Sequence, residues 1–183
     1  MSTEFLLRLT GRFWAAATSK VAVPAFIALT GLSAMAQVID ADPDWKEVDV
    51  PSPPALSQEP LIAVDMPIHV SLKFGVDPAS LTISKDGVVR YVMVAKSASG
   101  ATNTMYEGIR CSTGEYKTYA RQGSGGQWSN AKDAQWRPLN DNNASRHALA
   151  LARQGVCEGR SVAANNAARI IAVLKNPQQK SPP

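Results

Sequence analysis

The chain has 183 residues, a formal net charge of +4 at pH 7, and only two cysteines and two histidines. These few thiol and imidazole groups lack the close paired spacing of structural zinc motifs. No glycine-rich phosphate loop or calcium-loop pattern is present in the sequence either. We therefore predict neither a metal site nor a cofactor.

The first 36 residues have the pattern of a cleavable signal peptide. Arg8, Arg12 and Lys20 precede an apolar run from Val21 to Leu32, and small residues follow up to Ala36. The run is shorter than the roughly 20 residues that a membrane-spanning helix needs. We predict cleavage after Ala36, a mature chain without a transmembrane span, and a periplasmic or secreted location, with an uncleaved anchor as the alternative. Export also argues against nucleic acid as a partner.

Residues 37–60 are acidic and rich in proline, which predicts an extended arm. Trp45 is a single large aromatic residue within it. We expect Trp45 to pack on the folded domain, with docking onto an envelope protein partner as the alternative. Residues 61–176 are expected to form one α+β domain, and residues 177–183 a disordered tail.

The first half of this domain has the pattern of β-strands. Ile68–Phe74 alternates apolar and polar residues, which predicts a strand with His69 pointing outward. Asp77-Pro78 is expected to start a turn before a short strand, Ser80–Ser84. Val88–Ser97 is apolar on both faces, so we expect it to be central in its sheet.

The second half changes from strands to helices. Strands are predicted at Asn103–Ser112 and Tyr116–Ala120, a short helical turn at Asn130–Trp136, and helices at Ala144–Cys157 and from a cap at Ser161 to Lys175. Because strands come first and helices follow, the predicted fold is an antiparallel meander of about five to six strands packed by two C-terminal helices.

Cys111 and Cys157 are the only cysteines. In an oxidising compartment we expect them to form a disulfide bond that joins a helix to the sheet, with two buried free thiols as the alternative.

A few charged and aromatic residues are candidates for binding: Arg90, Tyr106, Glu107, Arg110 and Trp128. Glu107 shares an otherwise apolar strand face, so its charge must find a partner, and Arg90 on the neighbouring strand is the candidate. Nothing near His69 or His147 in the sequence supplies a nucleophile or an orienting carboxylate. The basic residues of the helical region are expected to face the acidic arm, anionic headgroups or solvent.

Three stretches resemble a known family: Asp86-Gly87-Val88-Val89-Arg90-Tyr91, the strand Tyr106–Cys111, and Trp128 with Trp136. Over roughly Trp45 to Cys157 the chain is similar to the CNP-one-like (CNP1-like) family of exported proteins of Gram-negative bacteria. The resemblance implies an envelope protein and a shared fold. It supplies no catalytic residues.

Without a catalytic motif, the chain is expected to be a non-catalytic binding or scaffold module of the periplasm or envelope. The alternative is a hydrolase or lyase that acts on envelope material through Glu107, Arg110 and Tyr106. Burial of all three side chains would favour the module, whereas a solvent-open cleft around them would favour the enzyme.

Overall fold

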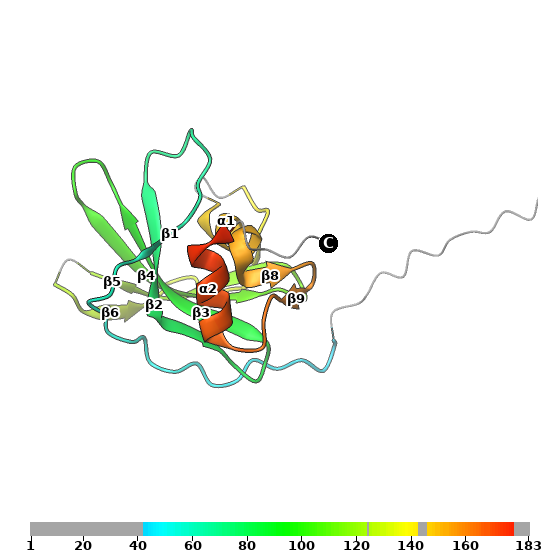
Figure 1. Cartoon of the computed structure of the whole chain (residues 1–183). Helices are drawn as coiled ribbons and strands as arrows, with labels where there is room; N and C mark the ends of the chain where they lie inside the picture. Colours follow the sequence, from blue (N-terminus) through cyan, green and yellow to red (C-terminus); the bar gives the residue numbers. More distant parts are fainter. Residues whose placement is uncertain (1–41, 124, 143–145, 178–183) are drawn as a thin grey trace, which may run out of the picture. The chain divides into compact units, whose positions relative to one another are not determined.

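An antiparallel meander forms the centre of the computed structural model, which describes residues 42–123, 125–142 and 146–177 (Figure 1). The strands lie across the sheet in chain order: β1 (Ile62–Ala63), β2 (Lys73–Ile83), β3 (Val88–Lys96), β4 (Thr102–Arg110), β5 (Glu115–Gln122) and β6 (Trp128–Asn130). A further short strand, β7 (Arg137–Pro138), pairs with β5. The predicted signal peptide, with its cleavage site after Ala36, and the tail after residue 177 lie outside the described residues.

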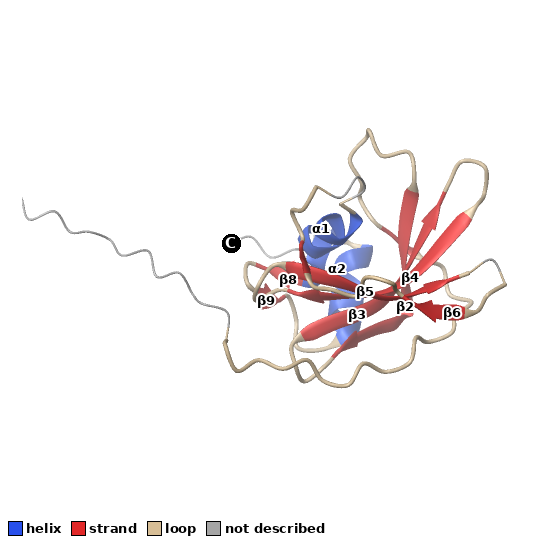
Figure 2. Ribbon diagram, turned by 180° about the vertical axis from the view of Figure 1, so that it is seen from behind, coloured by secondary structure: helices blue, strands red, loops and turns tan. Residues whose placement is uncertain are grey.

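Two helices follow the sheet in the chain and lie against one of its faces, which we call the inner face (Figure 2). The first, α1 (His147–Leu151), continues as a π-helix, η1 (Ala152–Val156). A hairpin of β8 (Cys157–Glu158) and β9 (Ser161–Val162) then leads to α2 (Ala167–Lys175). The predicted α+β class, with a meander and two C-terminal helices, is confirmed.

The central strand β3 is buried on both faces, as its sequence predicts. Val89, Tyr91 and Met93 point into the core between sheet and helices, where they join Leu151 and Ile170. On the opposite, outer face a smaller cluster forms around Val92, Tyr106, Tyr119 and Ala120. Because each fully buried large apolar side chain contributes about 1.5–3 kcal/mol, the inner core supplies most of the hydrophobic stabilisation.

The strand predictions before β3 are wrong in two places. Residues 64–72 form a loop in which Ile68 is fully exposed, and the strand begins only at Lys73. It then runs straight through the expected turn at Asp77-Pro78, where the pairing with β3 shifts register. There the hydroxyl of Ser80 donates to the carbonyl of Asp77 at 2.7 Å and accepts from the backbone N–H of Val92 at 2.7 Å. This side chain therefore replaces a ladder hydrogen bond, which lets the strand continue through a bulge.

The helix predictions are right in number and wrong in extent. The described part of the first helix starts at His147 and continues through η1 to Val156, but the backbone of Gly155 inside η1 is not helical, and an added Cβ atom there would meet Val173 at 2.6 Å. Ser161 lies in β9 and does not cap α2; the cap is Asn166, whose side chain accepts from the backbone N–H of Arg169 at 2.9 Å. The expected helical turn at 130–136 holds a turn at residues 132–133 and no helix.

Cys111 and Cys157 form the predicted disulfide bond, so the alternative of two free thiols is wrong. Cys111 follows β4 directly, and Cys157 opens the hairpin between the two helices rather than ending the first one. The bond therefore ties the connection between the helices to the sheet.

The described part of the arm, residues 42–60, contains no helix or strand and runs along the outer face of the sheet (Figure 1, cyan). The expected packing of Trp45 on the domain is confirmed: its ring lies against the guanidinium group of Arg110 at 3.6 Å and meets Trp136 edge-on at 5.9 Å. The sheet is thus covered by helices on one face and by the arm on the other.

Candidate functional site

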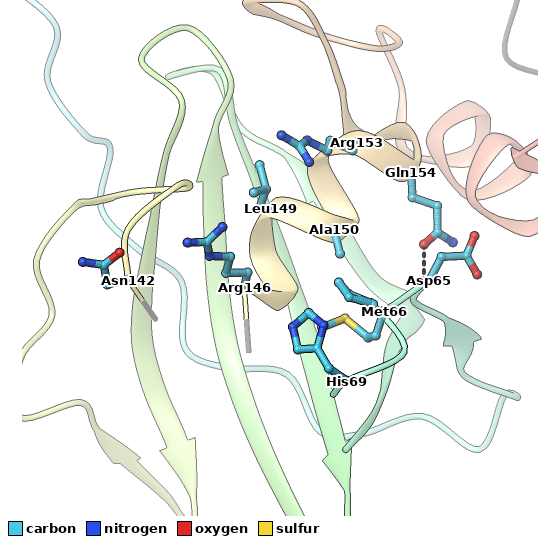
Figure 3. A pocket seen from close by; sticks show the side chains of 10 residues that line it. Asp65, Met66, His69, Asn142, Arg146, Leu149, Ala150, Arg153 and Gln154 are labelled. Atoms are coloured by element: carbon cyan, nitrogen blue, oxygen red, sulfur yellow. Dashed lines mark hydrogen bonds between the residues drawn. The ribbon is translucent and has the colours of Figure 1, made fainter. Parts of the chain in front are cut away.

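A pocket of about 870 Å³ lies between the loop 64–72 and α1 with η1 (Figure 3). His69 and Met66 face it from the loop, and Arg146, Leu149 and Arg153 come from the helical side. Its full lining is Asp65, Met66, Pro67, His69, Asn142, Arg146, Leu149, Ala150, Arg153 and Gln154.

Gln154 fixes the geometry of this pocket because its side-chain amide joins three segments. The amide nitrogen donates to the carbonyls of Ala63 at 2.9 Å and Leu174 at 3.1 Å. The amide oxygen accepts from the backbone N–H of Asp65 at 2.9 Å, the contact drawn in Figure 3. Since Gln154 is itself buried, the start of the loop is held at a set position against both helices.

The pocket combines positive charge with apolar surface. Arg146, Arg153 and His69 are its basic groups, and Asp65 is the one acidic residue in its lining. Met66, Leu149 and Ala150 supply apolar surface. Guanidinium groups bind carboxylates and phosphates by paired hydrogen bonds, and apolar walls bind alkyl or aryl groups. The site therefore fits a small amphipathic anion.

A second polar cluster is buried on the inner face, where Glu107 of β4 pairs with His147 of α1. The imidazole Nε2 lies 3.1 Å and 2.9 Å from the two carboxylate oxygens. The hydroxyl groups of Thr118 and Tyr91 donate to the same carboxylate, at 3.0 Å and 3.4 Å. Phe74 stacks on the imidazole with 4.9 Å between ring centroids, so the His147 ring is held by packing as well as by its hydrogen bonds.

The charges of Glu107 and His147 stabilise each other. Burial opposes ionisation of Glu107, but His147 and the Thr118 hydroxyl lower the pKa of Glu107 below its ordinary value of 4.5. Burial also opposes ionisation of His147, but Glu107 raises the pKa of His147 above its ordinary value of 6.5. Between pH 4.5 and 6.5 the two groups therefore form an ion pair. The pair lines a pocket of about 490 Å³ whose outer walls carry Arg121 and Lys132.

A third cluster, which we call the arm cradle, lies on the outer face and consists of Arg90, Lys117, Tyr119 and Trp136. All four donate to the carboxylate of Glu47 in the arm. The distances to its oxygens are 3.3 Å from Arg90, 2.8 Å from Lys117, 2.7 Å from the Tyr119 hydroxyl and 3.3 Å from the Trp136 indole N–H. Burial opposes ionisation of Glu47, yet Lys117 and Tyr119 lower its pKa below 4.5.

Arg90 is held by the sheet as well as by the arm. Its guanidinium group donates to Asp86 at 2.9 Å and to the Ser84 hydroxyl at 2.6 Å, and the side chain is 0% exposed. The indole N–H of Trp45 donates to the backbone carbonyl of the same Asp86 at 2.8 Å. The start of β3 and the turn before it therefore carry part of the contacts of the arm.

The structure separates the residues that the sequence grouped as one candidate site. Arg90, Tyr106 and Arg110 lie toward the outer face, and Trp128 packs against the outer cluster. Glu107 points to the inner face. The predicted pairing of Glu107 with Arg90 is therefore wrong: Glu107 pairs with His147, and Arg90 pairs with Asp86 and Glu47. The partners differ because neighbouring residues of a strand point to opposite faces.

Several important residues were not found from the sequence. His147 lies 40 residues after its partner Glu107, and Glu47 lies 43 residues before Arg90. One glutamate among the several acidic residues of a proline-rich arm resembles any solvated acidic residue. The one available signal was its position two residues after Trp45, the aromatic residue that was expected to pack. His69 is exposed as predicted, but its place in the pocket follows from the loop that replaced the expected strand.

The comparison with known proteins covers the pocket and both polar clusters described above. The model of the CNP1-like family matches residues 40–175, a span that includes the arm contacts, the sheet and both helices. The chain belongs to the CNP1-like family. No curated protein matches it, and no solved structure does.

Two further observations concern metals and membranes. Within the described ranges, no group of three or more histidine, cysteine, aspartate or glutamate side chains is arranged to hold a metal ion. None of the helices in this part of the CNP1-like chain has the length and apolar character needed to cross a bilayer. The disulfide bond is of the kind that persists in oxidising compartments outside the cytosol.

Proposed function

We propose that this CNP1-like protein is an exported, non-catalytic binding module of the periplasm or cell envelope. Its ligand is a small amphipathic anion, a carboxylate or phosphate with an apolar chain, held in the pocket of His69, Arg146 and Arg153. The observation that carries the proposal is the lining of that pocket, where basic side chains from two elements converge beside apolar ones.

A binding role is supported by the burial of the three residues that were expected to act together in an enzyme. Tyr106 is 2% exposed, Glu107 0% and Arg110 8%, so all three members of the cluster expected for an enzyme are buried. Glu107 is also on the opposite face from the other two. The carboxylate of Glu107 already accepts three hydrogen-bond donors, which keeps it in its charged, structural state.

Export is supported by the disulfide bond and by the signal-peptide pattern of the first 36 residues. Intact mass spectrometry of protein recovered from the periplasm and medium of an expressing bacterium tests it. We expect a chain that begins at Gln37. A recovered mass that retains residues 1–36 contradicts export by cleavage.

The ligand class is tested with dodecanoate below its micelle concentration, using isothermal titration calorimetry. Removal of one charged hydrogen-bonding group costs roughly ten- to a hundredfold in affinity, so we expect Arg146→Ala and Arg153→Ala each to weaken binding by at least tenfold. Arg169→Ala, at an exposed position of α2, is the matched control and is expected to bind as the wild type does. Dodecanol, which lacks the charge, is expected to bind weakly.

Two results would count against this assignment. If dodecanoate and dodecanol bind equally, the arginines do not recognise the anion. If the Arg169 variant loses as much affinity as the Arg146 and Arg153 variants, the effect reflects net charge and not the pocket.

A further inference from the structure

Three of the four residues of the arm cradle, Arg90, Lys117 and Tyr119, lie on strands of the sheet. Arg90 is fixed by Asp86 and Ser84, both of which belong to the β2–β3 region. Lys117 and Tyr119 are two residues apart on β5, and therefore point to the same face. The cradle thus directs one buried guanidinium, one ammonium, one phenol and one indole donor at a carboxylate, and the sheet holds the guanidinium through contacts other than the arm.

The arm that occupies the cradle is fastened at few points. At one end, Trp45, Glu47 and the backbone N–H of Val48 make the contacts. At the other end Ser57 donates twice to the buried Asp77, at 2.6 Å and 2.8 Å. Residues 48–52 between these points are exposed. Because an exposed segment separates the two places, release of Trp45 and Glu47 would not require Ser57 to leave Asp77.

The cradle and the neighbouring Arg110 also have hydrogen-bond donors that the arm does not use. The buried Nε–H groups of Arg90 and Arg110 have no hydrogen-bond acceptor among the described residues. The guanidinium group of Arg110 stacks on Trp45, and no carboxylate within the described ranges lies in ion-pair distance of it. A buried donor without an acceptor is a cost that a better ligand can remove.

From these contacts we infer that the arm cradle is a binding site for an acidic, aromatic segment of another protein, and that the chain's own arm holds the site closed. The segment carries a tryptophan or tyrosine with a carboxylate two residues later. It supplies at least one further acceptor, for Arg110. Charge complementarity favours this occupant, because Arg90 and Lys117 pair with the carboxylate of Glu47 and Arg110 adds a third positive charge where it stacks on Trp45.

A second copy of this chain is a poorer occupant for a physical reason. The arm of a second copy would make the same contacts as the chain's own arm. The chain's own arm is tethered, so its effective concentration is about millimolar, whereas the second copy would also lose translational freedom on binding. Only a segment with additional contacts can displace the tethered arm at lower concentration. Each extra charged hydrogen bond corresponds to roughly ten- to a hundredfold in affinity.

The test uses the full mature chain with Trp45→Ala and Glu47→Ala, which releases the arm, and a fluorescent peptide with the sequence of residues 42–50. We expect the released variant to bind one peptide per chain, and the wild type to bind at least tenfold more weakly because its own arm competes. A peptide with Lys46→Glu, which adds a carboxylate beside the tryptophan, is expected to bind at least tenfold more tightly than the native sequence.

Matched controls separate recognition from general attraction. The peptide with Glu47→Gln is expected to lose at least tenfold in affinity, and so is the released chain with Lys117→Met. Lys132→Met, at an exposed residue that lines the pocket of Glu107 and His147 and is not among the residues that donate to Glu47, should leave binding unchanged. If the double variant shows no cooperative melting, full-length Glu47→Gln replaces it, because this change alters one functional group and keeps Trp45.

Three results would overturn the inference. The first is a folded, released variant that does not bind the peptide. The second is peptide binding that survives Lys117→Met unchanged. The third is exchange of arms between copies, detected as a dimer of the wild type by light scattering at the peptide concentrations used.

Discussion

Replacing Glu107 with glutamine should destabilise the fold by about 3 kcal/mol at pH 5.5, because breaking a buried ion pair from one side costs about 3–5 kcal/mol and glutamine keeps part of the hydrogen bonding. Glu107 is 0% exposed and accepts from His147, Thr118 and Tyr91. Glutamine offers one acceptor oxygen in place of two and places an N–H₂ group where a donor already points.

The loss of stability caused by Glu107→Gln should depend on pH. The pKa of Glu107 is lowered by folding, so its contribution is complete above its unfolded value of 4.5 and is lost as the pH falls through the folded pKa. The pKa of His147 is raised, so its contribution is complete below 6.5 and is lost as the pH rises through the folded pKa. The difference between wild type and Glu107→Gln is therefore largest between pH 4.5 and 6.5 and narrows on both sides.

Urea unfolding followed by tryptophan fluorescence measures this difference at several pH values. Glu115→Gln on the neighbouring strand β5 is the control for loss of one carboxylate, and its effect should stay within about 0.5 kcal/mol. A loss of less than 1 kcal/mol in the free energy of unfolding of Glu107→Gln at pH 5.5, or an equal loss at pH 5.5 and pH 9, would show that the buried ion pair does not stabilise the fold in this way.

Three other sets of substitutions have expected effects on the stability of the fold. Replacing Cys111 and Cys157 with alanine should lower the free energy of unfolding by about 4 kcal/mol, from the chain entropy of a loop with a sequence separation of 46, and urea unfolding of the variant against the oxidised wild type measures it. Gly108→Ala should lower the free energy of unfolding by about 1–3 kcal/mol, since the added Cβ would lie 2.7 Å from a tyrosine hydroxyl oxygen. Gly125→Ala, with open space around it, is the control and should change the melting temperature little. An equal shift in melting temperature for both variants would contradict a packing clash at Gly108. Asn166→Ala removes the cap of α2 and should cost about 1 kcal/mol, measured by thermal melting; no loss would show that the cap is dispensable.

The sheet was largely predictable because its strands are joined by short turns. In β3 the two-sided apolar pattern identified a central strand, and the turn before it holds Gly87 at a φ of 76°. The strand before that turn was not predictable in the same way. Asp77 and Pro78 have the residue types of a turn, and only the tertiary contacts with Ser57, Ser80 and Val92 show how an aspartate and a proline are accommodated inside a strand.

The polar clusters were less predictable, because each joins segments that are far apart in the chain. Strand alternation correctly placed Glu107 on the apolar face and indicated that it needs a partner. It did not identify His147, since the position of α1 over the sheet depends on how all of the core packs. The pocket was missed for a similar reason: an alternating pattern at Ile68–Phe74 predicted a strand, whereas the segment is mostly a loop that brings His69 to Arg146 and Arg153.

The contacts of Glu47 also set an order in which the molecule is completed. The side chains that donate hydrogen bonds to Glu47 come from β3, β5 and the segment before β7. The most distant of them in the sequence, Trp136, lies 89 residues after Glu47. The earliest described segment of the sequence consequently has no docking place until three strands and the loop beyond them have assembled. The part of the tryptophan fluorescence that is lost in Trp45→Phe should therefore reach its final value after the sheet signal during refolding, and so reports the last step of folding.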